Sequence, residues 1–368
     1  MKKVAYVASV MSHIKSFHLP YLKDLQASGY ETNVIANNDI DLPFCNKKYI
    51  VSFERSPLNL NNIKAYFQLK DILNDNYFDF VHCHTPVASF LTRIAAIKTR
   101  KKGTKIIYTA HGFHFFKGAP VINWLIYFPI EWICSFFTDV LITINREDCS
   151  FANSHLHAKN TYYLPGVGID TDKYYCSTKT SSLKEIFDLS DETIILFSVG
   201  ELNKNKNHEV ILRAMARINN PHIHYFIAGQ GRMHDYLLSL AKELGLSDRF
   251  HLLGYRTDIV DLLECSDIFC FPSLREGLPV SVMEAMASGL PIVASKIRGN
   301  TDLIDDDKGG FLFNPHDING FAKGLEALIK DKNIRSRMGR ENVTKIKQFS
   351  CEIVYKEMEA IYRTNGLK

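Results

Sequence analysis

Two glutamates, Glu276 and Glu284, lie around a loop-to-helix transition in the C-terminal third of this 368-residue chain. A strand signal over 267–271 precedes them, and Pro279 stands where a helix begins, with a fixed φ and no unused N–H. The backbone amides of Gly277, Leu278 and the first helical turn would then point away from the strand end. Such amides, with the helix dipole, bind phosphate or diphosphate groups.

Carboxylates beside a phosphate site are unfavourable unless they accept hydrogen bonds from hydroxyl groups, and sugars carry many hydroxyls. A pair of acids that bind a ribose and a hexose would explain Glu276 and Glu284. Acidic residues that complement the dipole of a helix N-terminus would explain them equally well. Spacing alone leaves both interpretations open.

A second phosphate-like segment follows the strand predicted over 193–199. Gly200 lets the backbone approach a ligand, Lys204 and Lys206 supply positive charge, and Asn205 lies between them. The spacing is not that of a P-loop, and a solvated lysine loop is the alternative. Further along, Gly229 follows a strand as part of a weak Gly-x-Gly turn, and Arg256 follows another strand, where it could contact a base.

The elements that must position these residues alternate between short apolar runs and helical segments, the pattern of parallel sheets covered on both faces. We predict a first α/β domain over 1–166, a linker rich in small and charged residues over 167–192, and a second α/β domain over 193–351. The C-terminal helix over about 352–368 is a candidate to pack back on the first domain. Ligands of such sheets bind beyond the carboxyl ends of the strands, where the residues named above lie.

The predicted strands and helices of the two domains come in chain order. In the first domain, strands are expected over 4–10, 32–36, 78–84, 105–111, 139–145 and 160–166, with helices over 18–28 and 86–99. In the second, strands are expected over 193–200, 222–229, 249–254, 267–273, 291–295 and 310–313, with helices over 207–219, 232–244, 257–265, 280–288 and 317–330.

The segment EGLPVSVMEAMASGLPIVAS, with seven residues between its two glutamates, resembles the signature of retaining glycosyltransferases of family 4. The resemblance extends over essentially the whole chain and also includes YTAHGFHFFKGAP (108–120), HCHTPVASFLTR (82–93), LITINREDCSFA (141–152) and PGVGID (165–170). It implies the GT-B fold, two doubly wound Rossmann-like domains that face a cleft. It further implies an enzyme that builds bacterial capsule or exopolysaccharide.

In the resembled family the first glutamate contacts the transferred sugar and the second contacts the nucleotide ribose, and these roles carry to Glu276 and Glu284. The resemblance also places His111 near the transferred sugar and Lys206 on the phosphates. The chain departs from the family at Glu201, where arginine is usual.

The first loop, 9–18, lacks the glycine pair of many relatives. We assign Ser12, Ser16 and His18 to acceptor or diphosphate contacts there.

The implied reaction transfers a hexose or N-acetylhexosamine from a UDP-sugar, with retention, to a lipid-linked or other saccharide acceptor. The leaving diphosphate takes the proton of the acceptor, so no cofactor and no metal are expected. The acidic runs at 39–41 and 305–307 are interpreted as polar turns. Two alternatives stay open, and a third, a nicotinamide-dependent oxidoreductase, fits poorly because no GxGxxG motif follows either first strand. A UDP-sugar epimerase of the same fold would convert its donor without acceptor, and a non-catalytic nucleotide-binding partner subunit is favoured by Glu201.

Charge and composition suggest where such an enzyme would work. Residues 1–165 carry 18 Lys and Arg against 12 Asp and Glu, which fits an anionic partner or a scatter of surface lysines, and no motif indicates nucleic acid. Eight cysteines without paired spacing indicate a reducing cytoplasm. The apolar segment 121–137 predicts a buried helix pair broken at Pro129, with docking at the inner face of the cell membrane as the alternative. Lysines and an arginine at 98–105 would favour that docking.

Overall fold

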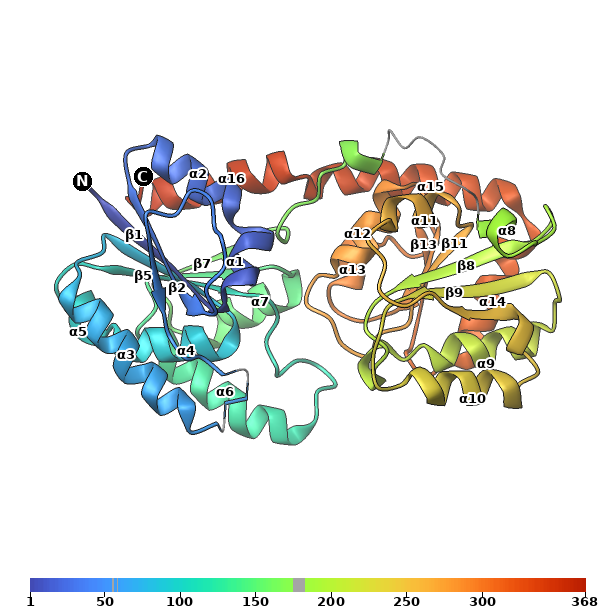
Figure 1. Ribbon diagram of the computed structural model, residues 1–368, viewed down its shortest axis with the longest axis horizontal. Coiled ribbons are helices and arrows are strands. Elements are labelled where there is room, and N and C mark those ends of the chain that lie inside the picture. Colours follow the sequence, from blue (N-terminus) through green and yellow to red (C-terminus); the bar gives the residue numbers. More distant parts are fainter. Residues whose placement is uncertain (55, 58, 175–182) are drawn as a thin grey trace. The chain divides into compact units, whose positions relative to one another are not determined.

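A computed structural model describes residues 1–54, 56–57, 59–174 and 183–368. The chain forms two compact units (Figure 1), of which the first comprises Met1–Val167 with Val354–Lys368 and the second comprises Gly168–Ile353. The linker predicted over 167–192 includes residues 175–182, which lie outside the described residues.

The first unit is built on a seven-stranded sheet with the order β3-β2-β1-β4-β5-β6-β7, and every paired neighbour is parallel. Its strands are β1 (Lys3–Val10), β2 (Glu31–Asn37), β3 (Lys47–Ile50), β4 (Phe80–His84), β5 (Lys105–Ala110), β6 (Val140–Thr143) and β7 (Asn160–Tyr163). The helices are α1 (Met11–Phe17), α2 (Leu19–Ala27), α3 (Asn61–Asp75), α4 (Pro86–Ala95), α5 (Ile97–Lys101), α6 (Val121–Ser135) and α7 (Arg146–His155).

The C-terminal helix α16 (Cys351–Thr364) packs with the first unit beyond Ile353, and Figure 1 shows it beside α2. The hydroxyl of Tyr362 lies 2.6 Å from that of Tyr6 on β1 and 2.7 Å from Nδ1 of His82 on β4. The ring of Tyr355 stacks on that of Tyr21 in α2. Buried polar contacts of this kind fix the position of a helix that apolar packing alone would leave free to slide.

The second unit has a six-stranded parallel sheet with the order β10-β9-β8-β11-β12-β13. Its strands are β8 (Ile194–Val199), β9 (Ile223–Ala228), β10 (Phe250–Leu252), β11 (Ile268–Phe271), β12 (Ile292–Ser295) and β13 (Gly310–Phe313). The α-helices are α8 (Leu183–Ile186), α9 (Glu209–Ile218), α10 (His234–Glu243), α11 (Ile259–Glu264), α12 (Val280–Ala287), α13 (Asn300–Leu303), α14 (Ile318–Lys330) and α15 (Lys332–Ile346), and the short 3-10 helices of the chain are η1 (Asp172–Tyr174), η2 (Lys204–Lys206), η3 (Ser247–Arg249) and η4 (Lys347–Phe349).

Both sheets reverse their strand order once, between β1 and β4 in the first unit and between β8 and β11 in the second. At such a point the connections leave in opposite directions and open a crevice at the carboxyl ends of the strands. The expected architecture of two doubly wound Rossmann-like domains is therefore confirmed. In each unit we expect a ligand to bind at this point of reversal.

Three expectations about the first unit are wrong. The loop expected over 9–18 contains helix α1, and the helix expected over 18–28 is α2, which begins after a break at His18. Strand β3 was missed because its Lys-Lys-Tyr-Ile sequence lies at the sheet edge, largely exposed, and lacks an apolar run. The single helix expected over 86–99 is divided at Ala96 into α4 and α5.

The helix pair expected around Pro129 is also wrong, because α6 continues through this proline. Pro129 lies on the exposed side of α6 and has no N–H to donate to the backbone carbonyl one turn earlier. On this side of the helix water can donate to that carbonyl instead. Nor is the segment buried. Val121 and Leu125 are 73% and 68% exposed.

Candidate functional site

The switch point of the second sheet brings Lys206 and Glu276 together. Lys206 ends η2, which follows β8, and Glu276 lies in the loop after the neighbouring strand β11. The Lys206 Nζ is 2.8 Å from Oε1 of Glu276, and both side chains are mostly buried. The Lys206 ammonium also lies 4.6 Å from the ring centre of Phe271. A lysine has three N–H donors, so it can hold this carboxylate and still bind an anionic oxygen.

Hydrogen bonds hold the two loops against each other. The Leu274 backbone amide donates to the carbonyl of Asn205 at 2.7 Å, and Nδ2 of Asn205 donates to the Arg275 carbonyl at 3.0 Å. Asn207 has a left-handed backbone, with φ 53°, and its side-chain Nδ2 donates to the carbonyls of Pro272 and Pro315. The Lys206–Glu276 pair is thus positioned before any ligand arrives, which reduces the cost of ordering it on binding.

Two glycines let backbone segments approach closely at this edge of the sheet. A Cβ at Gly229 would lie 1.8 Å from the carbonyl oxygen of Gly200, so the turns after β9 and β8 could not meet as they do. Gly299 has φ +77°, and a Cβ there would lie 2.2 Å from the carbonyl oxygen of Gly277. The loop that carries Glu276 and Gly277 therefore packs directly on the backbone of Gly299, where a larger residue would not fit.

Helix α12 begins at Val280 after Pro279, which has φ −77°, and no side chain caps its first turn. The preceding residues are Gly277, which is half-buried, and Leu278, which is 8% exposed. Uncapped amides at a helix N-terminus carry partial positive charge and can donate to an anion. The Lys206 ammonium at the adjacent loop adds to this field.

Glu284 is a half-buried residue of α12, and its Oε1 accepts a hydrogen bond from the Tyr174 hydroxyl at 2.9 Å. Burial raises the pKa of Glu284, and the hydrogen bond from Tyr174 opposes this shift in part. A carboxylate has about four acceptor positions, so further hydroxyl donors can still be bound. Tyr174 was missed in the sequence because it lies in the segment interpreted as a linker.

Arg298 was also missed. It lies three residues after β12, is 6% exposed, and its Nε donates to the Glu276 carbonyl at 3.1 Å. The rule that functional residues follow strand ends would have found it. Glu201, at the position where arginine is usual, is exposed.

Arg256 is not brought to this group. It follows β10, which β9 separates from β8, and its Nε donates to Asp258 at 2.8 Å. Over the described ranges, no contact joins Arg256 to Lys206 or Glu276. Its role in binding a base stays a prediction.

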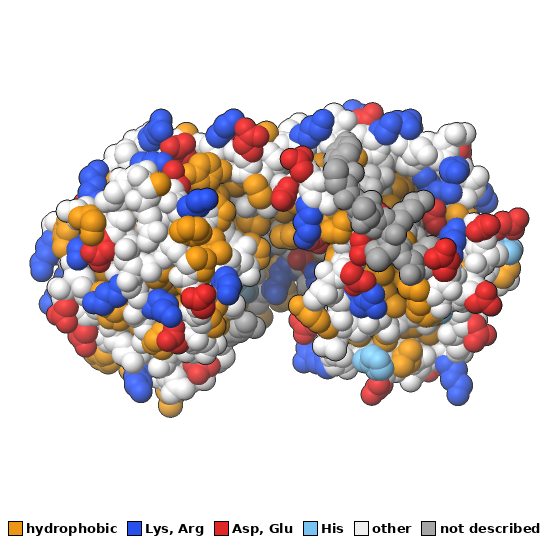
Figure 2. Space-filling view, turned by 45° about the horizontal axis from the view of Figure 1, so that its top comes forward, with side chains coloured by type: hydrophobic (Ala, Val, Ile, Leu, Met, Phe, Trp, Pro, Cys, Tyr) orange, Lys and Arg blue, Asp and Glu red, His pale blue; other side chains and the backbone are white. Residues whose placement is uncertain are grey.

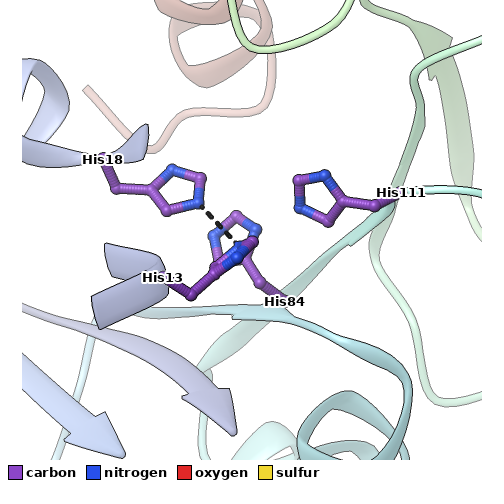
Figure 3. Close-up of side chains that lie close together, drawn as sticks. All are labelled: His13, His18, His84 and His111. Atoms are coloured by element: carbon purple, nitrogen blue, oxygen red, sulfur yellow. Dashed lines mark hydrogen bonds between the residues drawn. The ribbon is translucent and has the colours of Figure 1, made fainter. Parts of the chain in front are cut away.

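The switch point of the first sheet carries His111, which follows β5, together with three more histidines (Figure 3). His13 lies in α1, His18 lies between α1 and α2, and His84 ends β4. Burial lowers the pKa of His111 to about 3 and that of His13 to about 4, so the imidazoles are neutral at physiological pH.

Of the residues assigned to the first loop, only His18 joins this cluster. Ser12 and Ser16 lie on the exposed side of α1. No role was predicted for His13 or His84, because the four histidines come from segments far apart in the chain.

An apolar cavity of about 270 Å³ lies in the first unit between α4, α6 and the residues after His111. Its walls include Val87, Phe90, Phe113, Phe115, Ile126 and Tyr127. Glu131 also lines it and forms two hydrogen bonds with the buried guanidinium of Arg93, at 2.7 and 3.0 Å.

The chain matches two family models, Glycosyl transferases group 1 over residues 180–344 and Glycosyl transferase 4-like over residues 3–145. It is 37% identical over 366 residues to the EpsD protein of Bacillus subtilis (strain 168), covering 98% of this chain and 96% of that protein. It is 32% identical over 295 residues to the UDP-Gal:alpha-D-GlcNAc-diphosphoundecaprenol alpha-1,3-galactosyltransferase of Escherichia coli, covering 77% and 75% of the two chains.

The fold is similar to that of Anabaena Alr3699/HepE, whose crystal structure was determined in complex with UDP-glucose. The TM-score is 0.77 at 18% sequence identity, and the match covers 99% of this chain and 100% of the other. This likeness confirms the expected fold class.

Proposed function

The chain belongs to the group 1, family 4-like glycosyltransferases, and from this premise we propose that it transfers a hexose or N-acetylhexosamine from a UDP-sugar, with retention, to a lipid-diphosphate-linked saccharide of a bacterial surface polysaccharide. The observation that carries the proposal is the Lys206–Glu276 contact at the switch point, beside the uncapped N-terminus of α12. The Escherichia coli relative is named for a UDP-Gal donor and a diphosphoundecaprenol acceptor, which supports both substrate classes.

In this proposal the donor diphosphate binds the first-turn amides of α12 and the Lys206 ammonium. Glu284 accepts hydrogen bonds from the ribose hydroxyls, and Glu276 accepts them from the transferred sugar. The Lys206 ammonium, 2.8 Å from Oε1 of Glu276, provides an opposite charge to this carboxylate beside the donor. Three groups thus fix the donor at both ends and at the diphosphate between them.

The described side chains do not suggest a nucleophile paired with a general base. We therefore assign proton acceptance to the donor's own leaving diphosphate, on the same face of the sugar as the incoming hydroxyl. Lys206 and the amides of α12 then stabilise the negative charge that grows on the diphosphate in the transition state. His111, neutral and at the carboxyl end of β5, is proposed to hydrogen-bond the transferred sugar.

A lipid-linked acceptor lies in a membrane, and α6 has an exposed apolar face that could contact the membrane surface. Among the exposed apolar residues of this helix are Val121, Leu125 and Trp132. Basic helix α5 lies at its end, where Nη1 of Arg100 donates to the Phe136 carbonyl at 3.1 Å. Apolar side chains beside lysines suit an anionic lipid surface, so we propose peripheral association through this face.

Two further observations bear on that association. In the described ranges of the chain, no helix is both long and apolar enough to cross a membrane. Over the face shown in Figure 2, acidic and basic side chains are interspersed on both units, without a continuous basic patch.

A donor screen tests the proposal. Purified protein is incubated with UDP-sugars, with and without an N-acetylhexosamine linked to diphosphoundecaprenol, and UDP release is measured. We expect UDP release from one donor that depends on acceptor and is abolished in Glu276→Ala. A new epimer formed without acceptor would identify an epimerase instead, and no turnover with any donor would support the non-catalytic subunit.

A further inference from the structure

The four histidines at the first switch point form an unusual donor set. One ligand nitrogen from each of His13, His18, His84 and His111 lies within 4.8 Å of the others, and Figure 3 shows the rings directed toward one another. They come from α1, the start of α2, the end of β4 and the segment after β5, so the fold gathers them rather than a local motif. We infer that these residues bind one divalent transition-metal ion, with zinc the best candidate.

The two histidines of β4 differ in their hydrogen bonds. His82 is a satisfied core residue, with Nδ1 at 2.7 Å from the Tyr362 hydroxyl and Nε2 at 2.8 Å from Oγ1 of Thr109. His84 is equally buried, yet neither of its nitrogens has a hydrogen-bond partner among the described residues. Leaving a buried polar atom unpaired costs about 1–3 kcal/mol. A metal ion bound by one of the two nitrogens would remove that cost for this nitrogen.

Nε2 of His111 is also buried without a partner in the described part of the chain. The Nε2 atoms of His13 and His18 lie 3.4 Å apart, within hydrogen-bond distance of each other. Two nitrogens bound to one tetrahedral zinc at about 2.0–2.1 Å would lie about 3.4 Å apart, so this pair already has the required spacing. The wider pairs need ring rotations that bring the nitrogens closer by up to roughly 1.4 Å.

The chemistry of the donors selects the class of metal. All four are imidazoles, and no carboxylate belongs to the group. Imidazole suits zinc, copper, nickel and cobalt, whereas magnesium and calcium prefer oxygen.

The site would fasten α1 to the ends of β4 and β5. An imidazole has two ring nitrogens, so a His111 bound to metal through one can still direct the other to a substrate. The inference does not depend on the identity of the donor or the acceptor. It differs from the sequence expectation of no metal, which considered only the two acidic runs.

Metal titration of tag-free, chelator-stripped protein tests this inference. Zinc is titrated in competition with a chromophoric chelator, and cobalt is added separately to record its visible spectrum. We expect one zinc ion per chain, a tetrahedral cobalt spectrum and no binding of magnesium. His13→Ala removes a ligand at the half-exposed edge of the cluster and should weaken zinc binding on the order of 100-fold or more. His157→Ala, an exposed histidine outside the cluster, is the matched control and should bind as the parent does.

A second readout separates metal binding from misfolding. Zinc should raise the Tm of the parent and of His157→Ala, but not that of His13→Ala or His84→Gln, because a ligand that binds only the folded state stabilises it. Equal zinc affinity in the parent and His13→Ala, or stoichiometric binding that disappears in His157→Ala, would overturn the inference. So would a parent protein that binds no zinc.

Discussion

Replacement of Glu284 by glutamine separates the binding role of this residue from any role in proton transfer. The change keeps the shape of the side chain and removes its charge. Hydrogen bonds to a charged group contribute about 1.5–3 kcal/mol, against about 0.5–1.5 for neutral ones. The hydrogen bonds from the two ribose hydroxyls should therefore contribute about 2–3 kcal/mol less to the free energy of binding. This loss weakens UDP binding by roughly 30- to 150-fold.

Calorimetric titration with UDP and with 2′,3′-dideoxy-UDP measures this loss. The parent should bind dideoxy-UDP more weakly than UDP, and this difference should be smaller in Glu284→Gln, because the hydroxyls and the carboxylate are partners in one interaction. Tyr174→Phe is the control for the existing hydrogen bond to Glu284, and it should change UDP affinity far less. Normal UDP binding by Glu284→Gln, or an equal loss with dideoxy-UDP, would refute the ribose assignment.

The pKa of Glu284 predicts that the same substitution affects the stability of the fold differently from UDP binding. Burial raises this pKa, so the folded state favours the protonated carboxyl more than the unfolded state does. The stabilising contribution of that proton is complete below the unfolded pKa and is lost as pH rises through the folded one. At neutral pH, Glu284→Gln should thus be at least as stable as the parent while it binds UDP less well. A clearly lower Tm would indicate that Glu284 has a structural role.

Three further predictions concern the other groups. Lys206→Ala should lower kcat by about 10²–10³-fold in steady-state assays with the accepted donor, since it removes a donor to the leaving diphosphate, and an unchanged kcat would contradict this role. Glu131→Gln leaves the Arg93 guanidinium, 1% exposed, without its ion pair and should cost about 3–5 kcal/mol in urea unfolding; a change below 1 kcal/mol would contradict this. Leu125→Glu on α6 should reduce sedimentation with anionic liposomes at low salt while UDP binding is kept, and undiminished sedimentation would exclude this face.

Much of the donor site could be predicted from the sequence because one local rule applies to it. Lys206 and Glu276 each follow a strand, and β8 and β11 are neighbours at the switch point, so a sheet of this order must bring them together. Tyr174 escaped because no local pattern marks it, whereas Arg298 follows β12 and was overlooked although the same rule applies to it. Each contacts a donor-site glutamate more than twenty residues away.

The first unit shows what a linear reading cannot supply. Hydropathy predicted burial of 121–137, but burial depends on which elements cover a helix, and much of α6 is exposed. Pro129 indicated a break that the exposed side of a helix can avoid. His13 and His84 were passed over because their significance lies in convergence with His18 and His111, which only the folded chain displays.

The anomeric configuration of the product distinguishes retention from inversion. A lipid-diphosphate-linked saccharide is incubated with the donor found in the screen, and the new glycosidic bond is examined by NMR for its anomeric coupling constant. We expect the same configuration at the transferred carbon as in the UDP-sugar, with Glu276→Ala inactive. An inverted configuration would contradict the proposal that the leaving diphosphate accepts the proton on the face where the acceptor attacks.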